Sequence, residues 1–554
     1  MASLIKKKVK GRTYYYVAES KRVDGKPRMV KQWYLGPIEK LIAYAEGNID
    51  KAEPREIECV EEGAVAVLSA IARELSVKEI TDRQCPKRKQ GMSVGDYILI
   101  AALNRAIRAA SKSKVSEWVE STALHLHHPY NKELLESQNF WDHFDKLSDD
   151  DVYKIGDAIA KKAVEVEKVA LDCLVYDTTN YYNYWDVLNP SELARMTKSK
   201  AGKHNLKHIG LALAVDRDHG LLLFHRLYPA NEHDSKVFKN LIDGLFEQIK
   251  SVVSDKKAIT FVFDKDINSE EAIEKLDESR HHFVGTRSCF HHKDLCRVAL
   301  DRYKDIEVPC GDSMPMFETT VELYGKDRRV IVAFNESTYR RQLARLEKNL
   351  EAAKAEMSFF KKKAKGADDR STLDSIEGQA REIVENYHVN GLLDLEVEEA
   401  VEGFRVSARK NFPAIEDAKT RFGKQVIFSN RETLSAAEIY AIYRDRAIVE
   451  NTFRITKSDA WVKMDPAFHW TDSKIRVHAL TCMIALLLVR VAHKRATAAG
   501  FKNGTERMME LLSNIKTALV FYPKSMKPHR ILCRLTPDQN ELLTQLKCEI
   551  PKVR

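Results

Sequence analysis

Hydrophobic and polar positions divide the chain into segments of different periodicity. Residues 1–36 contain two strand-like runs, GRTYYYVAESKR and PRMVKQWYLG, joined around the turn signal Asp24-Gly25. From about 38 to 165, apolar residues recur at helical spacing, most clearly in Ala64–Leu75, Val94–Ala110 and Asp149–Lys168. We therefore expect a small N-terminal β-hairpin followed by a helical region.

Strand-like periodicity begins at residue 170. The expected strands are Ala170–Tyr176, Ile209–Val215, Leu221–Tyr228, Ile259–Phe263 and His282–Gly285, and the expected helices lie near Ser235–Lys250 and Glu270–Glu278. The order of three strands, helix, strand, helix and strand predicts an antiparallel meander that leads into a mixed α/β sheet.

Residues 290–430 are expected to form an insertion. Its strand-like pieces are Glu318–Leu323, Arg329–Phe334, Gly403–Ala408 and Gln425–Phe428. A helix is expected from Ser337 to Lys363, and its apolar residues repeat at spacings of three and four, which is typical of a seam for a partner helix. The seam covers only about two and a half heptads, so packing within the molecule is favoured over a free coiled coil.

Another helix is expected over Ser435–Lys457, SAAEIYAIYRDRAIVENTFRITK, which has no Gly or Pro. At about 100° per residue, Tyr443, Arg446, Glu450 and Lys457 fall within an arc of roughly 60°. One interpretation is a solvated face with Arg446 and Glu450 as an ion pair. The other is a functional face directed at a neighbouring element.

Composition and charge are those of a soluble globular protein of several domains. The 554 residues are 44% hydrophobic and 31% charged, with a formal net charge of +9. Basic clusters occur at Lys6–Arg12, Lys87–Lys89, Arg105–Lys114, Lys198–Lys207 and Lys361–Lys365. They are compatible with a polyanionic partner such as DNA, although solvated surface is the simpler explanation.

The cysteines and the apolar segments indicate a compartment rather than a function. Nine cysteines occur without a CxxC pair, which argues against a zinc site or a disulfide framework. The N-terminus lacks an apolar export segment, and the apolar run Ala479–Ala492 is too short to span a bilayer. We expect this run to be a core helix and the protein to be cytoplasmic.

Two aspartates carry the candidate chemistry. Asp177 and Asp264 each follow an apolar strand-like run, and side chains at strand ends leave the packed sheet. Two such carboxylates on neighbouring strands would favour divalent cations, and Glu450 from a nearby helix would complete an oxygen-rich site for Mg²⁺ or Mn²⁺. Two ions about 4 Å apart can activate a water or a 3′-hydroxyl for phosphodiester chemistry.

The spacing of Tyr443, Arg446, Glu450 and Lys457 resembles the Y-R-E-K signature of bacterial insertion-sequence transposases, which are DDE recombinases with an RNase H-like core. The segments VYDTTNYY around Asp177, FVFDKDINS around Asp264 and KHIGLALAVDRDHGLLLFHRLYPANEHDSKVF are similar to the same group. The resemblance implies an RNase H-like mixed sheet flanked by helices, with a β-rich insertion before the helix that carries the catalytic Glu. It covers roughly 170–290 and 425–490.

The resemblance also implies roles for individual residues. The catalytic residues that hold two metal ions would be Asp177, Asp264 and Glu450. The residues that contact DNA near the scissile phosphate would be Tyr443, Arg446 and Lys457. One departure is Asp266, where relatives often have Gly; it would either join the metal site or cap a helix, and the cap is the simpler role.

Lesser candidates flank these motifs. The basic connector after Asp177 would either bind DNA phosphates or be solvated loop, and its members are Lys198, Lys200, Lys203, His204 and Lys207, of which Lys203 and Lys207 are our predicted DNA contacts. Trp461 and Trp470 would either stack on a displaced base or pack in the core. Asn268 and Ser269 are candidate helix caps.

The resemblance implies a transposase that binds the terminal inverted repeats of its element, cleaves the 3′ ends and joins them to target DNA, as a homodimer associated with the nucleoid. Two alternatives remain: a metal-dependent nuclease that only hydrolyses, and an inactive DNA-binding regulator. The expected segments are a β unit with possible DNA binding (1–45), a helical DNA-binding or dimerisation region (46–165), the first part of the core (166–290), the insertion (291–430), the second part of the core (431–500) and a helical tail (501–554).

Overall fold

The computed structural model describes residues 2–23, 26–46, 54–87, 91–128, 130–184, 190–197, 202, 205–253, 257–309, 311–366, 372–401, 403–458, 461–464, 471–522 and 528–550. The predicted turn at Asp24-Gly25 lies outside these residues, as do Lys198, Lys200, Lys203, His204 and Trp470. The chain divides into two compact units, one of Met1–Val60, Lys516–Arg534 and Ile550–Arg554, the other of Glu61–Ile515 and Leu535–Glu549.

The smaller unit begins with a three-stranded antiparallel sheet rather than a hairpin. Its strands are β1 (Ala2–Val9), β2 (Arg12–Val23) and β3 (Lys26–Gly36), followed by helix α1 (Ile38–Ala45). The sequence pattern missed β1 because its lysines replace the apolar alternation of a half-buried strand, and all of its residues except Ile5 are exposed. Lysines on an edge strand are a common protection against edge-to-edge pairing.

The smaller unit also contains a second sheet, in the order β18-β17-β4. These strands are β4 (Glu56–Glu61), β17 (Lys516–Phe521) and β18 (His529–Leu532). The expectation of a purely helical tail was therefore wrong. Only α18 (Thr505–Ser513) and α19 (Pro537–Gln545) are helical there, because runs as short as β17 cannot be assigned by periodicity.

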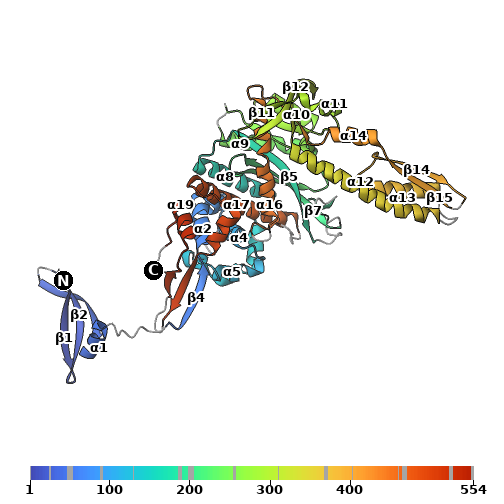
Figure 1. The fold of residues 1–554 in the computed structure, drawn as a ribbon. Helices are drawn as coiled ribbons and strands as arrows, with labels where there is room; N and C mark the ends of the chain where they lie inside the picture. Colours follow the sequence, from blue (N-terminus) through green and yellow to red (C-terminus); the bar gives the residue numbers. More distant parts are fainter. Residues whose placement is uncertain are drawn as a thin grey trace. The chain divides into compact units, whose positions relative to one another are not determined.

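The larger unit has a helical layer built around one apolar helix, α17 (Asp472–Ala498) (Figure 1). Its other helices are α2 (Gly63–Glu74), α3 (Val77–Gln84), α4 (Val94–Ile107), α5 (Val115–Glu120), α6 (Leu124–His127), α7 (Ser137–Phe144) and α8 (Asp149–Glu167). By length and composition α17 is a candidate membrane span, yet 94% of its apolar window is buried inside the protein. The prediction of a core helix is confirmed.

A ten-stranded mixed sheet forms the centre of the larger unit. Its strands are β5 (Cys173–Asn183), β6 (Arg195–Met196), β7 (Lys207–Asp216), β8 (Leu222–Pro229), β9 (Thr260–Val262), β10 (His282–Arg287), β11 (Lys304–Glu307), β12 (Ser313–Leu323), β13 (Lys326–Phe334) and β16 (Lys424–Ser429). Strands β5, β7 and β8 are antiparallel neighbours, whereas β5, β9 and β10 run parallel. Helices α9 (Asp234–Val252) and α10 (Glu270–Glu278) contribute to the apolar core on this sheet. The predicted RNase H-like mixed sheet flanked by helices is confirmed.

The strands expected in an insertion largely extend this same sheet. Strand β16 pairs antiparallel with β10 and β13, and β12 and β11 follow to the edge. The backbone pairing of the sheet is therefore continuous from β10 outward, and helix α11 (Lys293–Arg297) lies between β10 and β11 in the chain. Only the segment between β13 and β16 leaves the sheet.

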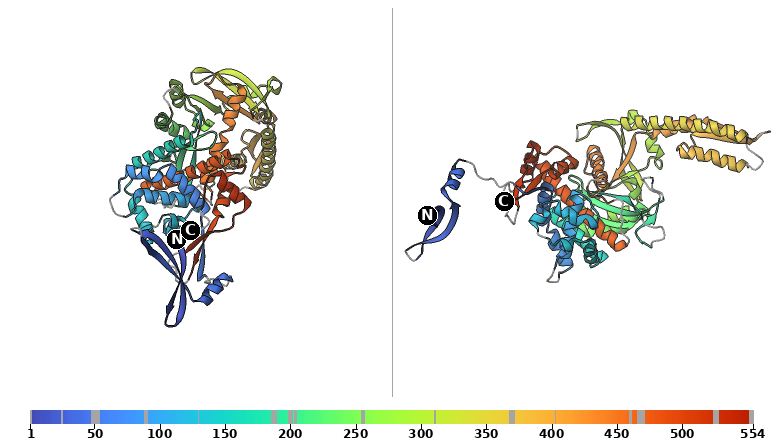
Figure 2. Two further views of the ribbon diagram at one scale, coloured as in Figure 1. Left: turned by 90° about the vertical axis from the view of Figure 1, so that its left-hand side faces the viewer. Right: turned by 90° about the horizontal axis from the view of Figure 1, so that it is seen from below.

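That segment is a lobe with its own apolar core. Its elements are α12 (Glu336–Lys365), α13 (Leu373–Asn386), β14 (Leu393–Glu399), β15 (Phe404–Lys410) and α14 (Phe412–Thr420). Helices α12 and α13 lie side by side (Figures 1 and 2), and the seam residues Leu346, Leu350 and Met357 are buried between them and the hairpin. Packing of the seam within the molecule is confirmed.

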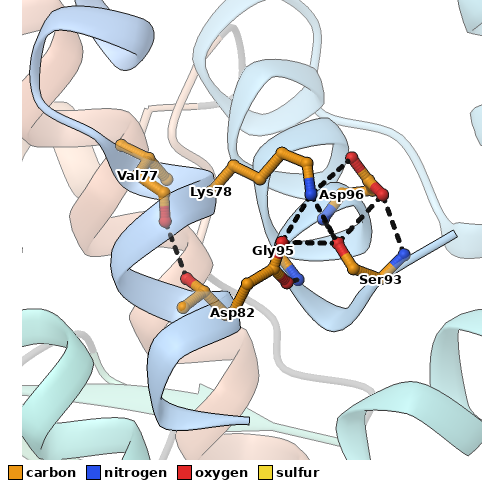
Figure 3. Close-up of polar contacts among 7 residues, drawn as sticks. Val77, Lys78, Asp82, Ser93, Gly95 and Asp96 are labelled. Atoms are coloured by element: carbon orange, nitrogen blue, oxygen red, sulfur yellow. Dashed lines mark hydrogen bonds and ion pairs between the residues drawn. The ribbon is translucent and has the colours of Figure 1, made fainter. Parts of the chain in front are cut away.

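A buried polar network joins α3 to the start of α4 (Figure 3). Ser93 caps α4 by accepting from the Asp96 backbone N–H at 3.2 Å, and its hydroxyl also meets Lys78 Nζ at 2.8 Å and Asp82 Oδ2 at 2.9 Å. Asp82 Oδ1 in turn accepts from the Gly95 N–H at 2.9 Å. Because Ser93 is 1% exposed, no solvent can replace these bonds.

We predict that Ser93→Ala lowers the free energy of unfolding by about 1–3 kcal/mol, since a cap and a shared buried hydroxyl are lost together. Ser148→Ala is the matched control, because Ser148 forms the same capping box at the exposed start of α8. Its cost should be about 1 kcal/mol. Urea unfolding followed by circular dichroism compares the two, and an equal or larger loss in Ser148→Ala would contradict the prediction.

Candidate active site

Strand register places Asp177 and Asp264 side by side. Val175 on β5 is opposite Val262 on β9 in parallel pairing, and each aspartate follows two residues later. Neighbouring strands lie about 4.8 Å apart, so the two carboxylates leave adjacent strands at the same level. Asp177 was expected at a strand end, which is wrong: β5 continues to Asn183 because it stays paired with β7. Only its pairing with the shorter β9 ends at Val175.

Asp264 is held by three donors. Its Oδ1 accepts from the Lys265 backbone N–H at 2.7 Å and from Thr286 Oγ1 at 3.0 Å, while Arg446 Nη1 lies 2.7 Å from Oδ2. Burial raises the pKa of Asp264, but the charge and hydrogen bond of Arg446 and the other two donors outweigh it and hold the pKa below its usual value. Asp264 is therefore an anion at neutral pH.

The expected helix over Ser435–Lys457 is two helices, α15 (Ala436–Arg444) and α16 (Ala447–Thr456). At the joint, the N–H groups of Ile448 and Val449 bond to the carbonyls of Asp445 and Arg446, three residues back, so the α-helical ladder is interrupted. The expectation of one continuous helix was wrong, and no Gly or Pro marks the break in the sequence. Arg446 lies at this joint, and its guanidinium forms an ion pair with Asp264.

Helix α16 is attached to β5 at its far end. Lys457 Nζ donates to Thr179 Oγ1 at 2.8 Å and lies 5.3 Å from the centre of the Tyr181 ring, whose hydroxyl bonds to Thr456. Thr179 and Tyr181 share a face of β5 with Asp177, since side chains alternate along a strand. The face that carries Asp177 is therefore the face that α16 lies on.

Glu450 lies between these two attachment points. Arg446 Nη2 is 3.2 Å from Glu450 Oε1, so the predicted i,i+4 ion pair is present, and the same guanidinium also binds Asp264. The Glu450 side chain is 57% exposed. From the other side, buried Arg490 on α17 donates to Thr452 Oγ1 at 2.9 Å. Contacts to β5, Asp264 and α17 together fix the helix that carries Glu450.

The remaining predicted DNA contacts are more buried than a solvated face would be. Tyr443 is 4% exposed and its ring lies under the Arg446 guanidinium, 5.0 Å from centroid to Cζ. Burial is the main cause that raises the pKa of Tyr443 to about 12, so the hydroxyl stays protonated. Lys207 opens β7 and is 7% exposed, and Trp461 is half-buried. Lys203 lies outside the described residues.

The neighbours of Asp264 have plain structural roles. Asp266 is exposed in a 3₁₀ turn, Lys265–Ile267. Ser269 caps α10 by accepting from the Ala272 N–H at 3.2 Å, as predicted, whereas Asn268 donates to the Thr286 carbonyl at 2.6 Å. Thr286 thus receives support from Asn268 and passes a hydrogen bond to Asp264.

Sequence reasoning missed Thr286, Thr179, Tyr181 and Arg490. Thr286 had a usable signal, because it lies near the end of β10, which runs parallel to β9 and therefore ends at the same edge of the sheet. Arg490 lies within the apolar run Ala479–Ala492, where a single charged residue carries no signal for a role. The others are polar residues within strands, which no pattern separates from ordinary sheet surface.

The carboxylate oxygens of Asp177, Asp264 and Glu450 suit a divalent cation, but in this structure Asp264 and Glu450 are paired with Arg446. Within the described ranges, no group of three His, Cys, Asp or Glu side chains is gathered closely enough to hold a metal ion. The guanidinium of Arg446 supplies the positive charge between Asp264 and Glu450 instead. Carboxylate oxygens are the preferred ligands of Mg²⁺ and Mn²⁺, so the residues fit such an ion once Arg446 moves.

Comparison with known proteins identifies a family for this chain. The model of the transposase DDE domain matches residues 188–488, more than half of the chain; the match includes Asp264 and Glu450 and begins after Asp177. A solved structure, the cryo-EM piggyBac transposase synaptic complex with hairpin DNA, is similar at 7% identity and a TM-score of 0.37 over 82% of this chain and 80% of that chain. No curated protein matches. On the family match, this chain belongs to the transposase DDE domain family.

Proposed function

We propose that this protein is an insertion-sequence transposase that binds the terminal inverted repeats of its element, cleaves the 3′ ends and joins them to target DNA. The observation that supports this best is the position of α16. Lys457 attaches it to β5 beside the strand face of Asp177, and Arg446 attaches it to Asp264, with Glu450 between the two contacts. This position of α16 supports a site in which Asp177, Asp264 and Glu450 act together.

Asp177, Asp264 and Glu450 would hold two divalent ions, Mg²⁺ or Mn²⁺. Such ions, when bound, activate the attacking oxygen and stabilise the leaving oxygen of a phosphodiester. The backbone N–H of Lys265 and the hydroxyl of Thr286 keep the Asp264 carboxylate oriented and ionised. Arg446 and Lys457 would pair with DNA phosphates, and Tyr443 would support Arg446 through its ring.

The N-terminal sheet is our candidate for DNA recognition outside the active site. Trp33 and Tyr34 are 45% and 57% exposed, and Lys31 Nζ lies 5.5 Å from the centre of the Trp33 ring. Lys7 lies 5.0 Å from the centre of the Tyr16 ring in the same way. Basic and aromatic side chains on a narrow antiparallel sheet suit the major groove and its phosphates. A homodimer in the DNA complex follows from the need to cut two ends.

A strand-transfer assay tests the proposal. The full-length protein is incubated with pre-cleaved DNA from the ends of its element, a supercoiled target plasmid and Mg²⁺. We expect joined products that depend on the metal ion. Hydrolysis without joining would show a nuclease instead, and the absence of metal-dependent cleavage together with specific DNA binding would show an inactive regulator.

A further inference from the structure

We infer that Arg446 is an internal counterion that keeps the candidate metal site closed until a DNA phosphate takes its guanidinium. The inference rests on the proposed function, because it assigns a regulatory role to a residue of that same site. It makes metal binding conditional on DNA binding. The protein alone would then bind divalent ions weakly.

The first support is the set of donors on Asp264. Oδ1 already accepts two hydrogen bonds, from Lys265 N–H and Thr286 Oγ1, so Oδ2 is the oxygen left to face a metal ion. That oxygen is 2.7 Å from Arg446 Nη1. A cation that approaches Oδ2 meets the positive charge of this guanidinium, so the ion pair weakens metal binding to Asp264 while it persists.

The second support is that the same guanidinium binds the other carboxylate. Arg446 Nη2 is 3.2 Å from Glu450 Oε1, so one planar group bridges two proposed ligands that come from different parts of the fold. A divalent ion bound to both carboxylates would occupy the space between them. Because ion and guanidinium carry like charge and need the same lone pairs, they exclude each other.

The third support is the position of Arg446 in the chain. It lies at the joint between α15 and α16, where the α-helical hydrogen-bond ladder is interrupted, and its side chain is 24% exposed. A phosphodiester offers a guanidinium the same bidentate geometry as a carboxylate, and the DNA backbone presents many such negative charges close together. DNA can therefore compete for Arg446 from the solvent side, leaving Asp264 and Glu450 to the metal ion.

Thermodynamic linkage between DNA binding and metal binding sets the size of the expected change in metal affinity. Removing a charge-assisted bridge should tighten metal binding by roughly 10- to 100-fold. If DNA removes the bridge in the wild type, DNA and metal ion must strengthen each other's binding by the same factor. A purely structural role for Arg446, which fixes α16 on the sheet, predicts no such coupling.

The test is Mn²⁺ binding to the full-length protein, measured by electron paramagnetic resonance. Without DNA, Arg446→Gln should bind Mn²⁺ roughly 10- to 100-fold more tightly than the wild type. Arg444→Gln is the matched control, because Arg444 belongs to the same stretch and forms an ion pair with Asp312, at 3.9 Å, outside the proposed site. It should bind as the wild type does. Equal or weaker Mn²⁺ binding in Arg446→Gln would overturn the inference.

A mixed-sequence DNA duplex provides the second arm. The duplex should tighten Mn²⁺ binding to the wild type and leave Arg446→Gln unchanged; equal tightening in both would overturn the counterion role. If Arg446→Gln fails to fold, Arg446→Met replaces it, since methionine has an unbranched side chain without a positive charge, and this variant should also bind Mn²⁺ more tightly than the wild type. If this variant binds Mn²⁺ no more tightly than the wild type, the counterion role is also overturned.

Asp264→Asn separates this inference from the proposed function. Mn²⁺ bound by Arg446→Gln should disappear when Asp264→Asn is added. If Asp264→Asn changes nothing, the proposed metal site itself is wrong and the counterion role falls with it. If the metal site is present but Arg446→Gln leaves its affinity unchanged, only the counterion role is wrong.

Discussion

Asp264→Asn is expected to lower the rate of DNA cleavage by about 10³-fold or more while DNA binding persists. The amide keeps the shape of the carboxylate, so Lys265 N–H and Thr286 Oγ1 retain an acceptor. It removes the negative charge that a divalent ion requires. Cleavage of labelled element ends in Mg²⁺ measures the rate, and a mobility-shift assay measures binding.

Asp266→Asn is the matched control for this substitution. Asp266 lies two residues away in the same turn, but its side chain is exposed and apart from the carboxylate site. We expect cleavage close to the wild-type rate. Wild-type cleavage by Asp264→Asn would remove Asp264 from the catalytic assignment, and a loss in Asp266→Asn equal to that in Asp264→Asn would transfer the role to the pair.

The candidate residues of this site could be named from the sequence because they depend on local signals. Asp264 follows a short apolar run. The spacing of Arg446, Glu450 and Lys457 can be read in the sequence although the expected single helix is divided into α15 and α16. What the spacing could not show is the partner of each side chain. Arg446 was expected on DNA, yet it bridges two carboxylates, because the register of β5 and β9 brings Asp264 to the helix joint.

The limits of the sequence pattern are clearest where polar strands are concerned. Strand β1 was missed because its lysines replace the apolar alternation that marks a half-buried strand, whereas β14, LDLEVEE, was missed although it alternates apolar and acidic residues, because the run is short. By contrast, the seam of α12 was assigned correctly, because its apolar spacing is long enough to separate a helix from a strand. The length of an apolar pattern, and the contrast between its apolar and polar positions, decided which elements the sequence could predict.

Basic runs illustrate the same limit for side chains. Arg105–Lys114 is one of the basic clusters that could contact phosphates, but two of its members are buried: Arg105 is 9% exposed and Lys112 is 6% exposed. Lys112 opens a 3₁₀ turn, Lys112–Lys114, and its ammonium lies 5.8 and 5.9 Å from the ring centres of Phe140 and Phe144. Lys112 Nζ has no hydrogen-bond partner in the part of the chain that the structure describes.

Burial lowers the pKa of Lys112 to about 7, and the charge of Arg105 acts in the same direction. In the unfolded chain a lysine has a pKa of about 10.4. Between these values the unfolded state binds more protons than the folded state, so the free energy of unfolding rises with pH. The slope is at most about 1.4 kcal/mol per pH unit for one group.

Lys112→Met is therefore expected to stabilise the protein at pH 7 by roughly 1–4 kcal/mol, because an apolar side chain replaces a buried amine without a partner. The variant should also lose the rise in stability between pH 7 and about 10 that Lys112 contributes. Thermal unfolding at several pH values compares it with Lys114→Met, a substitution of a neighbouring lysine that is exposed and paired with Glu117 at 3.3 Å. Lys114→Met should keep the wild-type pH dependence, since its charge is solvated in both states. Parallel pH profiles for Lys112→Met and the wild type would mean that Lys112 stays charged in the folded protein, and its ammonium would then require a partner.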